Sequence, residues 1–142
     1  MAYNNPLQVY EIFDNVEKQK TKAEKVKVLK NNDIWPIKDI LRAIYDDAIQ
    51  FLLPEGKPPY TPCKPESAPS SLLRANKQYK YFVKGGPGQG LPAVKREKMF
   101  IDILESVHPE EALILIDMIN KKSIKGITKA TVKEAYPDLI KE

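Results

Sequence analysis

The stretch INKKSIKGITKATVKEAYPDLI, residues 119–140, is the segment that the remainder of the chain is predicted to hold in place. It carries five lysines before its first acidic residue. Thr128 follows a turn at Gly126 and is a good N-cap, because its hydroxyl can accept a hydrogen bond from an amide in the first turn of a helix. Pro137 disfavours helical geometry in the residue before it, so the pattern predicts a short helix that ends near Tyr136.

The start of this predicted helix has the features of an anion-binding site. The first amides of a helix have no intrahelical partner and lie at the positive end of the helix dipole, so they attract negative charge. The lysines that surround this helix start in the sequence are Lys121, Lys122, Lys125, Lys129 and Lys133. Nucleic-acid phosphate is therefore the ligand that the segment predicts.

The same segment resembles the closing motif of a known DNA-binding domain, which reads Gly-x-Ser/Thr, a short helix, an aromatic residue and Pro-x-Leu-Ile. The residues that carry the resemblance are Gly126, Thr128, Tyr136, Pro137, Leu139 and Ile140. The motif closes the helical N-terminal DNA-binding domain of T-even-type phage ATP-dependent DNA ligases. The rest of the chain resembles that domain in outline, which implies an all-α fold.

Length and composition predict one intracellular domain that spans residues 1–142. No apolar run reaches membrane-spanning length and no signal-peptide pattern is present, so we expect a cytoplasmic protein without a membrane segment. Cys63 is the single cysteine, which excludes an internal disulfide and a cysteine-based zinc cluster.

Positive charge is concentrated in two segments, although the net charge is only +4. Residues 71–98 hold seven basic residues and one acid, and residues 120–133 hold five basic residues and no acid. Such segregation is typical of a protein with one polyanion-facing side. The sequence therefore predicts that both segments lie on a shared side of the fold.

Apolar residues recur at helical spacing and predict about six or seven helices in one compact domain. Asn5 and Pro6 predict the first helix start, as N-cap and first helical residue. Thr21 and Glu24 form a capping box for a second helix that runs to about Leu29. We interpret the lysines around it as surface residues whose stems cover apolar neighbours, with phosphate contact as the alternative. They are Lys18, Lys20, Lys22, Lys25, Lys27 and Lys30.

The third helix is predicted to be the longest and to form the centre of the core. Asn32-Asp33 is its expected cap, Pro36 fits its first turn, and the apolar stripe extends to Leu52. Trp35 is expected to pack at its start. A fourth helix is predicted from Ser70 or Ser71, with its aromatic residues inward and its cations outward.

Two loops interrupt the helices. Residues 54–69 hold half of the prolines, so they form a long surface loop, either as an ordered wrap or as a mobile excursion; a linker between two domains is the alternative. Residues 84–92 hold four of the six glycines but lack the Gly-Lys-Ser/Thr ending and the preceding strand of a P-loop. We interpret this second loop as a flexible turn whose amides can approach a DNA backbone.

No catalytic or metal-binding constellation is evident, and we expect a non-enzymatic chain without a cofactor. His108 is the only histidine and is interpreted as a cap or a surface residue at the start of a sixth helix, not as a catalyst. Asp46 and Asp47 diverge by about 100° on a helix and are expected to be surface carboxylates. The Lys-x-Asp-Gly motif of the ligase catalytic domain is missing, and the chain ends at Glu142, about where that domain would begin. The resemblance therefore implies a domain that binds DNA without sealing it.

In the ligase family this domain lies against duplex DNA and contacts phosphates and the minor groove with little sequence preference. The implied contacts are the amides around Gly126 and Thr128 together with Lys121, Lys122, Lys125 and Lys129. Lys121 stands where the family usually has arginine, and Lys122 where phage ligases often have aspartate. That second departure either strengthens phosphate binding or removes a local salt bridge and reshapes the turn.

A second contact region is implied at the start of the fifth helix, which resembles the matching ligase helix. Its residues are Lys84, Lys95, Arg96 and Lys98. The resemblance also implies that the pair Tyr45-Asp46, a short signature of ligase DNA-binding domains, is structural.

The leading functional prediction is a phage-type protein that binds double-stranded DNA on the nucleoid of an infected bacterial cell, with packaging in the virion as a further possibility. The alternative is a protein-interaction module that binds a phage or host replication or transcription protein through the Pro-rich loop. A third hypothesis is a detached subunit that lends DNA affinity to a separate catalytic chain.

Overall fold

The computed structural model describes residues 8–140, which contain seven α-helices and two short 3-10 helices. The helices are α1 (Val9–Lys18), α2 (Lys22–Asn31), α3 (Trp35–Tyr45), η1 (Pro65–Ser67), α4 (Leu72–Ala75), η2 (Asn76–Phe82), α5 (Ala93–Ser106), α6 (Pro109–Ile119) and α7 (Lys129–Ala135). Within these residues no strand forms, and one isolated backbone bridge joins Phe51 to Val83. The predicted all-α, single-domain fold is confirmed.

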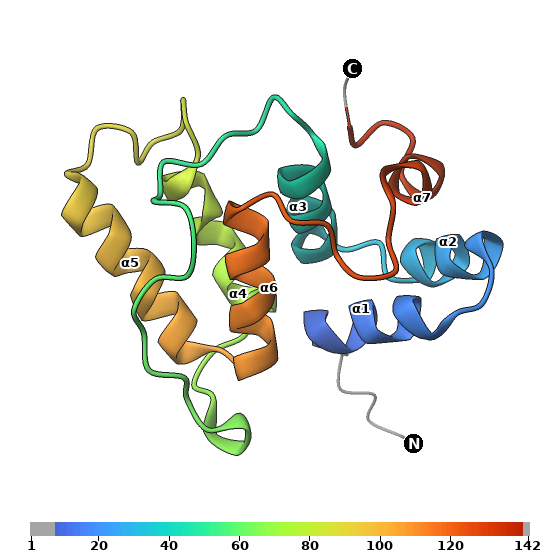
Figure 1. Ribbon diagram of the computed structural model, residues 1–142, viewed down its shortest axis with the longest axis horizontal. Coiled ribbons are helices and arrows are strands. Elements are labelled where there is room, and N and C mark those ends of the chain that lie inside the picture. The colour runs from blue at the N-terminus through green and yellow to red at the C-terminus, as the bar shows by residue number, and fades with distance from the viewer. Residues whose placement is uncertain (1–7, 141–142) are drawn as a thin grey trace.

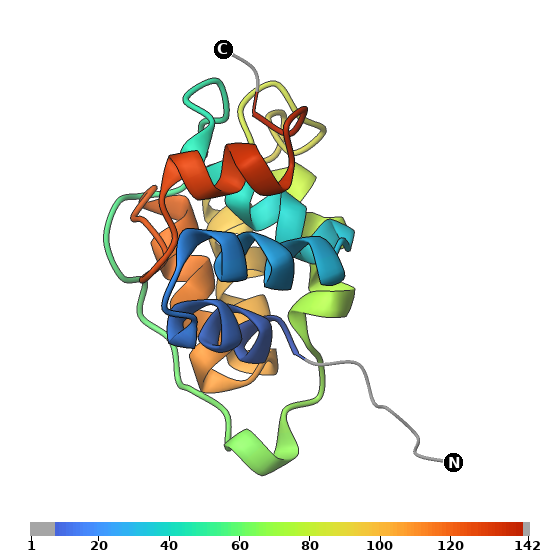
Figure 2. The same ribbon diagram turned by 90° about the vertical axis from the view of Figure 1, so that its right-hand side faces the viewer.

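The helices are arranged along a long axis, with α5 at one end and α2 and α7 at the other (Figure 1). Between these ends, α6 packs against α1, α3 and α5, so it shares the centre of the core with α3. Figure 2 views the end formed by α1, α2 and α7, where α2 packs against both of the others. One hydrophobic core runs through the molecule and includes Leu29, Leu41, Phe82, Leu115 and Val132.

The first two helices start at polar residues. The predicted start at Asn5 and Pro6 lies outside the described residues; within them, Gln8 is the N-cap of α1 and its amide donates to Glu11 Oε1 at 2.9 Å. Thr21 is the N-cap of α2, as predicted, and its hydroxyl accepts from the Glu24 amide at 3.2 Å. Local side-chain chemistry therefore decides where α2 begins.

Helix α3 is shorter than the apolar stripe predicts. Its N-cap is Ile34 rather than Asn32-Asp33, and it ends at Tyr45. Asp46 ends the helix because its carboxylate accepts from the Ala48 amide at 2.9 Å, a local bond that competes with helical geometry. The prediction of a helix to Leu52 is wrong for this reason.

Two further expectations for this region are also wrong. Asp46 is buried rather than on the surface, with 2% of its area exposed, and its carboxylate lies 3.7 Å from Arg42 Nε. Asp47 is exposed, as expected. Trp35 does not pack into the core: 64% of it is exposed, and Lys38 Nζ lies 4.2 Å from the centre of its ring.

The Pro-rich residues 54–69 form an ordered wrap over α5 and α6 within one domain. The amide and carbonyl of Gly56 bond with the side chain of Asn120 at 2.7 and 3.0 Å. The Thr61 amide donates to Glu105 Oε2 at 2.8 Å, and Cys63 Sγ donates to the Val107 carbonyl at 2.8 Å. These bonds attach the segment to the body of the protein between Gly56 and Cys63.

The Gly-rich residues 84–92 pack against η2 instead of forming the flexible turn that the sequence predicts. A Cβ at Gly88 would lie 1.9 Å from the Tyr81 carbonyl oxygen, so only glycine fits this close approach. The Gly86 amide donates to the Val83 carbonyl at 3.0 Å and is therefore not free for a phosphate. On η2 itself, Tyr79 and Phe82 are buried as predicted.

Candidate nucleic-acid interface

The basic turn, residues 120–128, is anchored by the residues that end α3. The Tyr45 hydroxyl donates to the Ile127 carbonyl at 2.6 Å and accepts from the Ile124 amide at 3.1 Å. The next residue, Asp46, accepts from Lys121 Nζ through its backbone carbonyl at 2.7 Å. Tyr45 and Asp46 thus have the structural role that the resemblance implies for them.

The side chain of Lys121 bonds to a backbone carbonyl within the protein, so Lys121 is removed from the set of predicted DNA contacts. Its φ of 54° places it in the left-handed region at the end of α6. Its amide donates to the Met118 carbonyl at 3.1 Å and the Lys122 amide donates to the Asp117 carbonyl at 2.8 Å, which is the Schellman pattern of a helix end. Burial lowers the pKa of Lys121, and its ammonium already has a carbonyl partner.

Gly126 fixes the position of the turn against α1 and α2. Its φ is +82°, and a Cβ there would lie 3.1 Å from Glu17 Cα. Its carbonyl accepts from Lys25 Nζ at 2.6 Å. Glycine is required here both for backbone geometry and for the close approach of the two segments.

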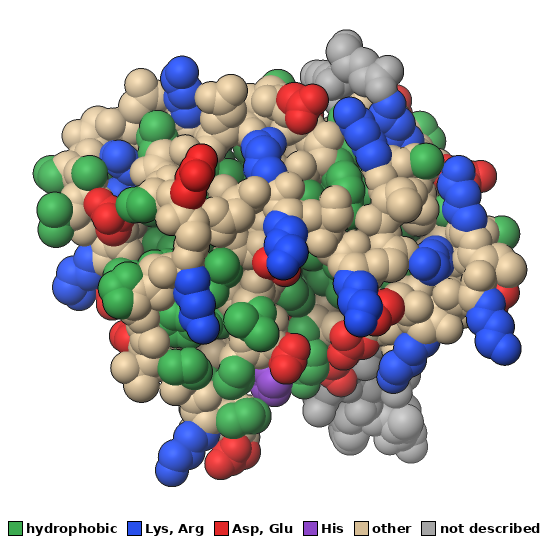
Figure 3. Space-filling model, viewed as in Figure 1, with side chains coloured by type: hydrophobic (Ala, Val, Ile, Leu, Met, Phe, Trp, Pro, Cys, Tyr) green, Lys and Arg blue, Asp and Glu red, His purple; other side chains and the backbone are tan. Residues whose placement is uncertain are grey.

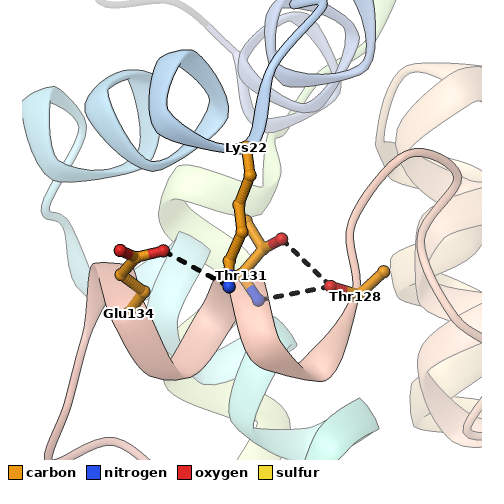
Figure 4. Close-up of polar contacts among 4 residues, drawn as sticks. All are labelled: Lys22, Thr128, Thr131 and Glu134. Atoms are coloured by element: carbon orange, nitrogen blue, oxygen red, sulfur yellow. Dashed lines mark hydrogen bonds and ion pairs between the residues drawn. The ribbon is translucent and has the colours of Figure 1, made fainter.

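Thr128 caps α7 as the sequence predicts. Its hydroxyl accepts from the Thr131 amide at 3.2 Å and lies 3.0 Å from the Thr131 hydroxyl (Figure 4). The helix ends at Ala135, with Tyr136 as C-cap, which confirms the predicted end. The buried Tyr136 hydroxyl donates to the carbonyl of Leu29 on α2, and burial raises the pKa of this tyrosine.

Helix α2 lies beside α7 and adds its lysines to those of the turn. Lys22 Nζ on α2 is 3.5 Å from Glu134 Oε2 on α7 (Figure 4). Residues 18–30 and 120–133 together hold eleven lysines and one acidic residue. We call their exposed lysines the basic end: Lys18, Lys20, Lys22, Lys27, Lys30, Lys122, Lys125 and Lys129. In Figure 3, blue side chains gather over the part of the molecule where α2 and α7 lie.

Two lysines of the basic end lie in exposed ion pairs. Besides the Lys22–Glu134 pair, Lys125 Nζ is 3.4 Å from Glu17 Oε1, with 87% of the lysine side chain exposed. Exposed pairs contribute about 0–1 kcal/mol, so a phosphate can replace these carboxylates at little cost. Thr128 is exposed and Gly126 is half-buried, so the start of α7 is accessible from solvent beside these lysines.

Comparison of the sequence with protein-family models identifies the family of this chain. The model of the "Family of unknown function (DUF6433)" matches residues 12–125, which is most of the chain. The chain belongs to this family. The DUF6433 match includes most of α1, all of α2 and the turn up to Lys125, and α7 lies beyond it. A search of curated proteins found no match.

The second contact region predicted for this DUF6433 member, at the start of α5, lies far from α7. Helix α5 is at the opposite end of the long axis from α7 (Figure 1). The start of α5 therefore does not adjoin the start of α7. The expectation that residues 71–98 and 120–133 share one side of the fold stays a prediction.

Arg96 in that region is a structural residue. It is 9% exposed; its Nε donates to the Leu52 carbonyl at 3.0 Å, and Nη1 donates to the carbonyls of Gly88 and Leu91 at 3.1 and 2.8 Å. Its guanidinium thus joins the Gly-rich loop to the start of the Pro-rich wrap. The prediction that Arg96 contacts DNA is wrong, because the side chain is buried and three of its N–H donors already bond to backbone carbonyls.

The three lysines of that region remain at the surface. Lys84 and Lys95 are exposed, and Lys98 forms an exposed pair with Asp102 at 3.3 Å. For the lysines of α2, the sequence favours solvated surface and leaves phosphate contact as the alternative. The position of α7 beside α2 favours that alternative.

Within residues 8–140, no helix combines the length and apolar character that crossing a bilayer requires. In the same part of the chain, no three His, Cys, Asp or Glu side chains group closely enough to hold a metal ion. His108 is the N-cap of α6: its Nδ1 accepts from the Glu110 amide at 3.0 Å, and its ring stacks on Tyr10 with 4.3 Å between centroids.

Proposed function

We propose that this chain is a non-enzymatic protein that binds double-stranded DNA through its basic end, largely without regard to sequence. The observation that supports this most directly is the contact of α2 with α7, which brings two lysine-rich segments onto one end of the molecule. Phosphates that meet these lysines release condensed counterions, which supplies the free energy of non-specific binding.

The composition of the basic end favours backbone contact over base recognition. Its cations are all lysines, whereas the arginines at positions 42, 74 and 96 lie outside it. Lysine acts on phosphate as a point charge, and it lacks the planar fork with which arginine reads guanine. Binding should therefore depend strongly on salt and weakly on sequence.

The resemblance to the phage ligase N-terminal domain supports duplex DNA as the ligand. It points to the accessible start of α7, with the amides near Gly126 and Thr128 and with Lys129 adjoining. In our proposal the lysines of α2 replace the start of α5 as the second contact region. The proposed setting is the nucleoid of a phage-infected bacterial cell.

The first test is a titration of a fluorescent random-sequence duplex, read by anisotropy across a salt series. With about four to six phosphate contacts, the logarithm of the affinity should fall by about 0.9 per contact for each tenfold rise in salt. Between about 50 and 200 mM salt, the affinity should drop by about 100- to 2,000-fold. A change below about tenfold would contradict phosphate binding as the main source of affinity.

The second test reverses charge at matched places. Lys27→Glu, Lys122→Glu and Lys129→Glu together change three exposed lysines of the basic end that have no ion pair within the described residues. The control combines Lys57→Glu, Lys64→Glu and Lys95→Glu, three exposed lysines outside the basic end that also have no ion pair within the described residues and that alter net charge equally. The first variant should lose duplex binding by about 100-fold or more, and the control should stay within about threefold. Equal losses would show that net charge, not the basic end, determines binding.

The alternative function, a protein-interaction module, predicts no duplex binding at any salt concentration. Its proposed contact was the Pro-rich segment 54–69. That segment bonds to the body of the protein at Asn120, Glu105 and Val107. These bonds give the Pro-rich segment a structural role in the fold. The duplex titration distinguishes the two proposed functions.

A further inference from the structure

A groove of about 950 Å³ lies between α3 and η2, and no lysine of the basic end lines it. Its floor is apolar and is formed by Ala43, Ile49, Phe51, Val83 and Met118. Trp35 and Arg42 line the groove from α3, and Lys77 and Lys80 line it from η2. Lys84, the first residue of the Gly-rich loop, also lines it. The groove thus combines an apolar floor with a cationic rim.

Trp35 is the unusual residue of this groove. Three large apolar side chains are exposed within residues 8–140, and Trp35 is the only aromatic one among them. Lys38 Nζ lies 4.2 Å from the centre of its ring and 2.7 Å from Asp33 Oδ1. The indole is therefore held beside the groove by a cation–π contact while most of its surface stays open to solvent.

The lysines opposite Trp35 are available to a ligand. Lys77 and Lys80 are one 3-10 turn apart, so their side chains project from the same side of η2. Lys77, Lys80 and Lys84 are exposed and have no ion pair within the part of the chain that the structure describes. Three cations along one wall form a track for a polyanion.

The acids that line the groove do not cancel this charge. Asp33 is paired with Lys38. Asp39 accepts from Asn76 Nδ2 at 3.2 Å, and its burial raises the pKa of the carboxyl. Asp33 therefore has an ion-pair partner and Asp39 a hydrogen-bond partner, and neither carboxylate pairs with Lys77, Lys80 or Lys84.

We propose that this groove binds single-stranded nucleic acid, with a base stacked on Trp35 and adjoining phosphates on Lys77, Lys80 and Lys84. An exposed aromatic ring beside a cationic track is the arrangement by which proteins bind single strands without sequence preference. A duplex keeps its bases stacked inside the helix, so it cannot offer one to the indole. In a single strand, the face of an unstacked base can pack against the apolar floor.

An acidic peptide is the other polyanion that such a rim could attract, and the backbone argues against it. The Leu52 amide donates to the Phe82 carbonyl at 2.7 Å, and the Lys84 amide donates to the Gln50 carbonyl at 2.8 Å. These bonds pair the two segments that border the groove with each other, so a peptide cannot insert between them as a strand. A stacked base needs only a ring face and nearby cations.

The inference does not depend on duplex binding at the basic end, because none of its residues belongs to that surface. Trp35 is also the only tryptophan of the chain, so tryptophan emission reports on this groove alone. The experiment titrates the full chain with oligothymidylate of about twelve nucleotides, with a random duplex, and with an acidic peptide of the same length that carries two central phenylalanines.

Oligothymidylate should quench the tryptophan emission in a saturable way, and the duplex should leave it unchanged. In anisotropy titrations with labelled oligothymidylate, Trp35→Ala should weaken binding by about 5- to 150-fold, the effect of losing one stacked base. Lys77→Glu with Lys80→Glu should weaken it by about tenfold or more, whereas the matched pair Lys64→Glu and Lys95→Glu should stay within about threefold.

Three results would overturn the inference: emission that does not respond to oligothymidylate, single-strand binding that survives both groove variants, or quenching by the acidic peptide alone. The last would assign the groove to a protein partner. Failure of duplex binding with intact quenching would instead reject only the function proposed above. Loss of duplex binding in the basic-end variant, with quenching retained, would establish two separate sites.

Discussion

At the scale of single residues, Glu111 holds three helix starts together. Its side chain is fully buried in the first turn of α6. Its carboxylate accepts from the Leu72 amide at 3.1 Å, at the start of α4, and from the Tyr10 amide at 3.4 Å, at the start of α1. Each of these ends carries partial positive charge, which offsets part of the cost of burying this carboxyl group.

Replacement of Glu111 by glutamine should lower the free energy of unfolding by about 1–3 kcal/mol, because the amide group would present a donor to a buried N–H. Chemical denaturation measures this, with Glu110→Gln, an exposed neighbour, as the control. Loss of the same stability in both variants would contradict the role of Glu111.

The pH dependence of the same variant has a definite sign. Burial raises the pKa of Glu111 above its ordinary value of 4.5, so the folded state binds this proton more tightly than the unfolded chain does. Its contribution to stability is complete below that ordinary value and is lost as pH rises through the raised pKa. The gap between the native chain and Glu111→Gln should therefore be wider in acid than at neutral pH. A gap that widens towards neutral pH would reverse this assignment.

Gly126 provides a second prediction at this scale. Alanine at this position would occupy a φ of +82° and would bring its Cβ to 3.1 Å from Glu17 Cα. The expected loss is about 1–3 kcal/mol in the free energy of unfolding. Gly90→Ala is the matched control, because a Cβ there meets no atom within 4 Å and the backbone is not left-handed. The control should be neutral or slightly stabilising; equal losses would mean that chain flexibility, not close approach, explains the result.

At the scale of elements, two tyrosines attach the terminal segment to the rest of the fold. Tyr45 on α3 bonds to Ile124 and Ile127 in the basic turn, and Tyr136 after α7 bonds to Leu29 near the end of α2. Both connections join parts of the chain that are distant in sequence. Together they set the position of α7 beside α2.

Tyr45→Phe should leave the Ile124 amide and the Ile127 carbonyl without their partner in a buried site, at a cost of about 1–3 kcal/mol. Hydrogen exchange should accelerate first at the amides of residues 123–128, because the turn opens before the core does. Tyr81→Phe is the control, since its hydroxyl has no hydrogen bond within the described residues. Uniform acceleration across all helices would show that Tyr45 supports the whole core rather than the turn.

At the scale of the whole molecule, charge and shape divide the chain into distinct surfaces. The basic end lies over α2 and α7, while the Pro-rich wrap covers α5 and α6. The groove with Trp35 lies between α3 and η2. A duplex on the end and a single strand in the groove are independent proposals, and the charge-reversal variants address them one at a time.

Much of the fold follows from patterns within a few residues. Thr21, Thr128 and His108 cap their helices as the sequence predicts, because a cap is a bond between a side chain and an amide two or three residues away. The end of α7 near Tyr136 follows equally from the proline after it. The all-α class follows from the spacing of apolar residues.

The candidate site could be predicted only in part. The basic turn and the start of α7 were identified from local charge and capping. Arg96 has the same sequence character as its neighbours Lys95 and Lys98, yet its guanidinium finds three carbonyls from Leu52, Gly88 and Leu91. The ammonium group of Lys121 likewise donates a hydrogen bond to the carbonyl of Asp46. Which cation becomes structural depends on acceptors that only the folded chain brings near.

The sequence by itself determined the helical class, most helix starts and the lysine content of the terminal segment, because each depends on neighbours along the chain. The tertiary structure alone decided that α2, not the start of α5, accompanies the basic turn. It also decided that α3 stops at Tyr45 and that Trp35 faces a groove. These outcomes depend on contacts between distant residues, such as Tyr136 with Leu29 and Lys25 with Gly126, which no local pattern encodes.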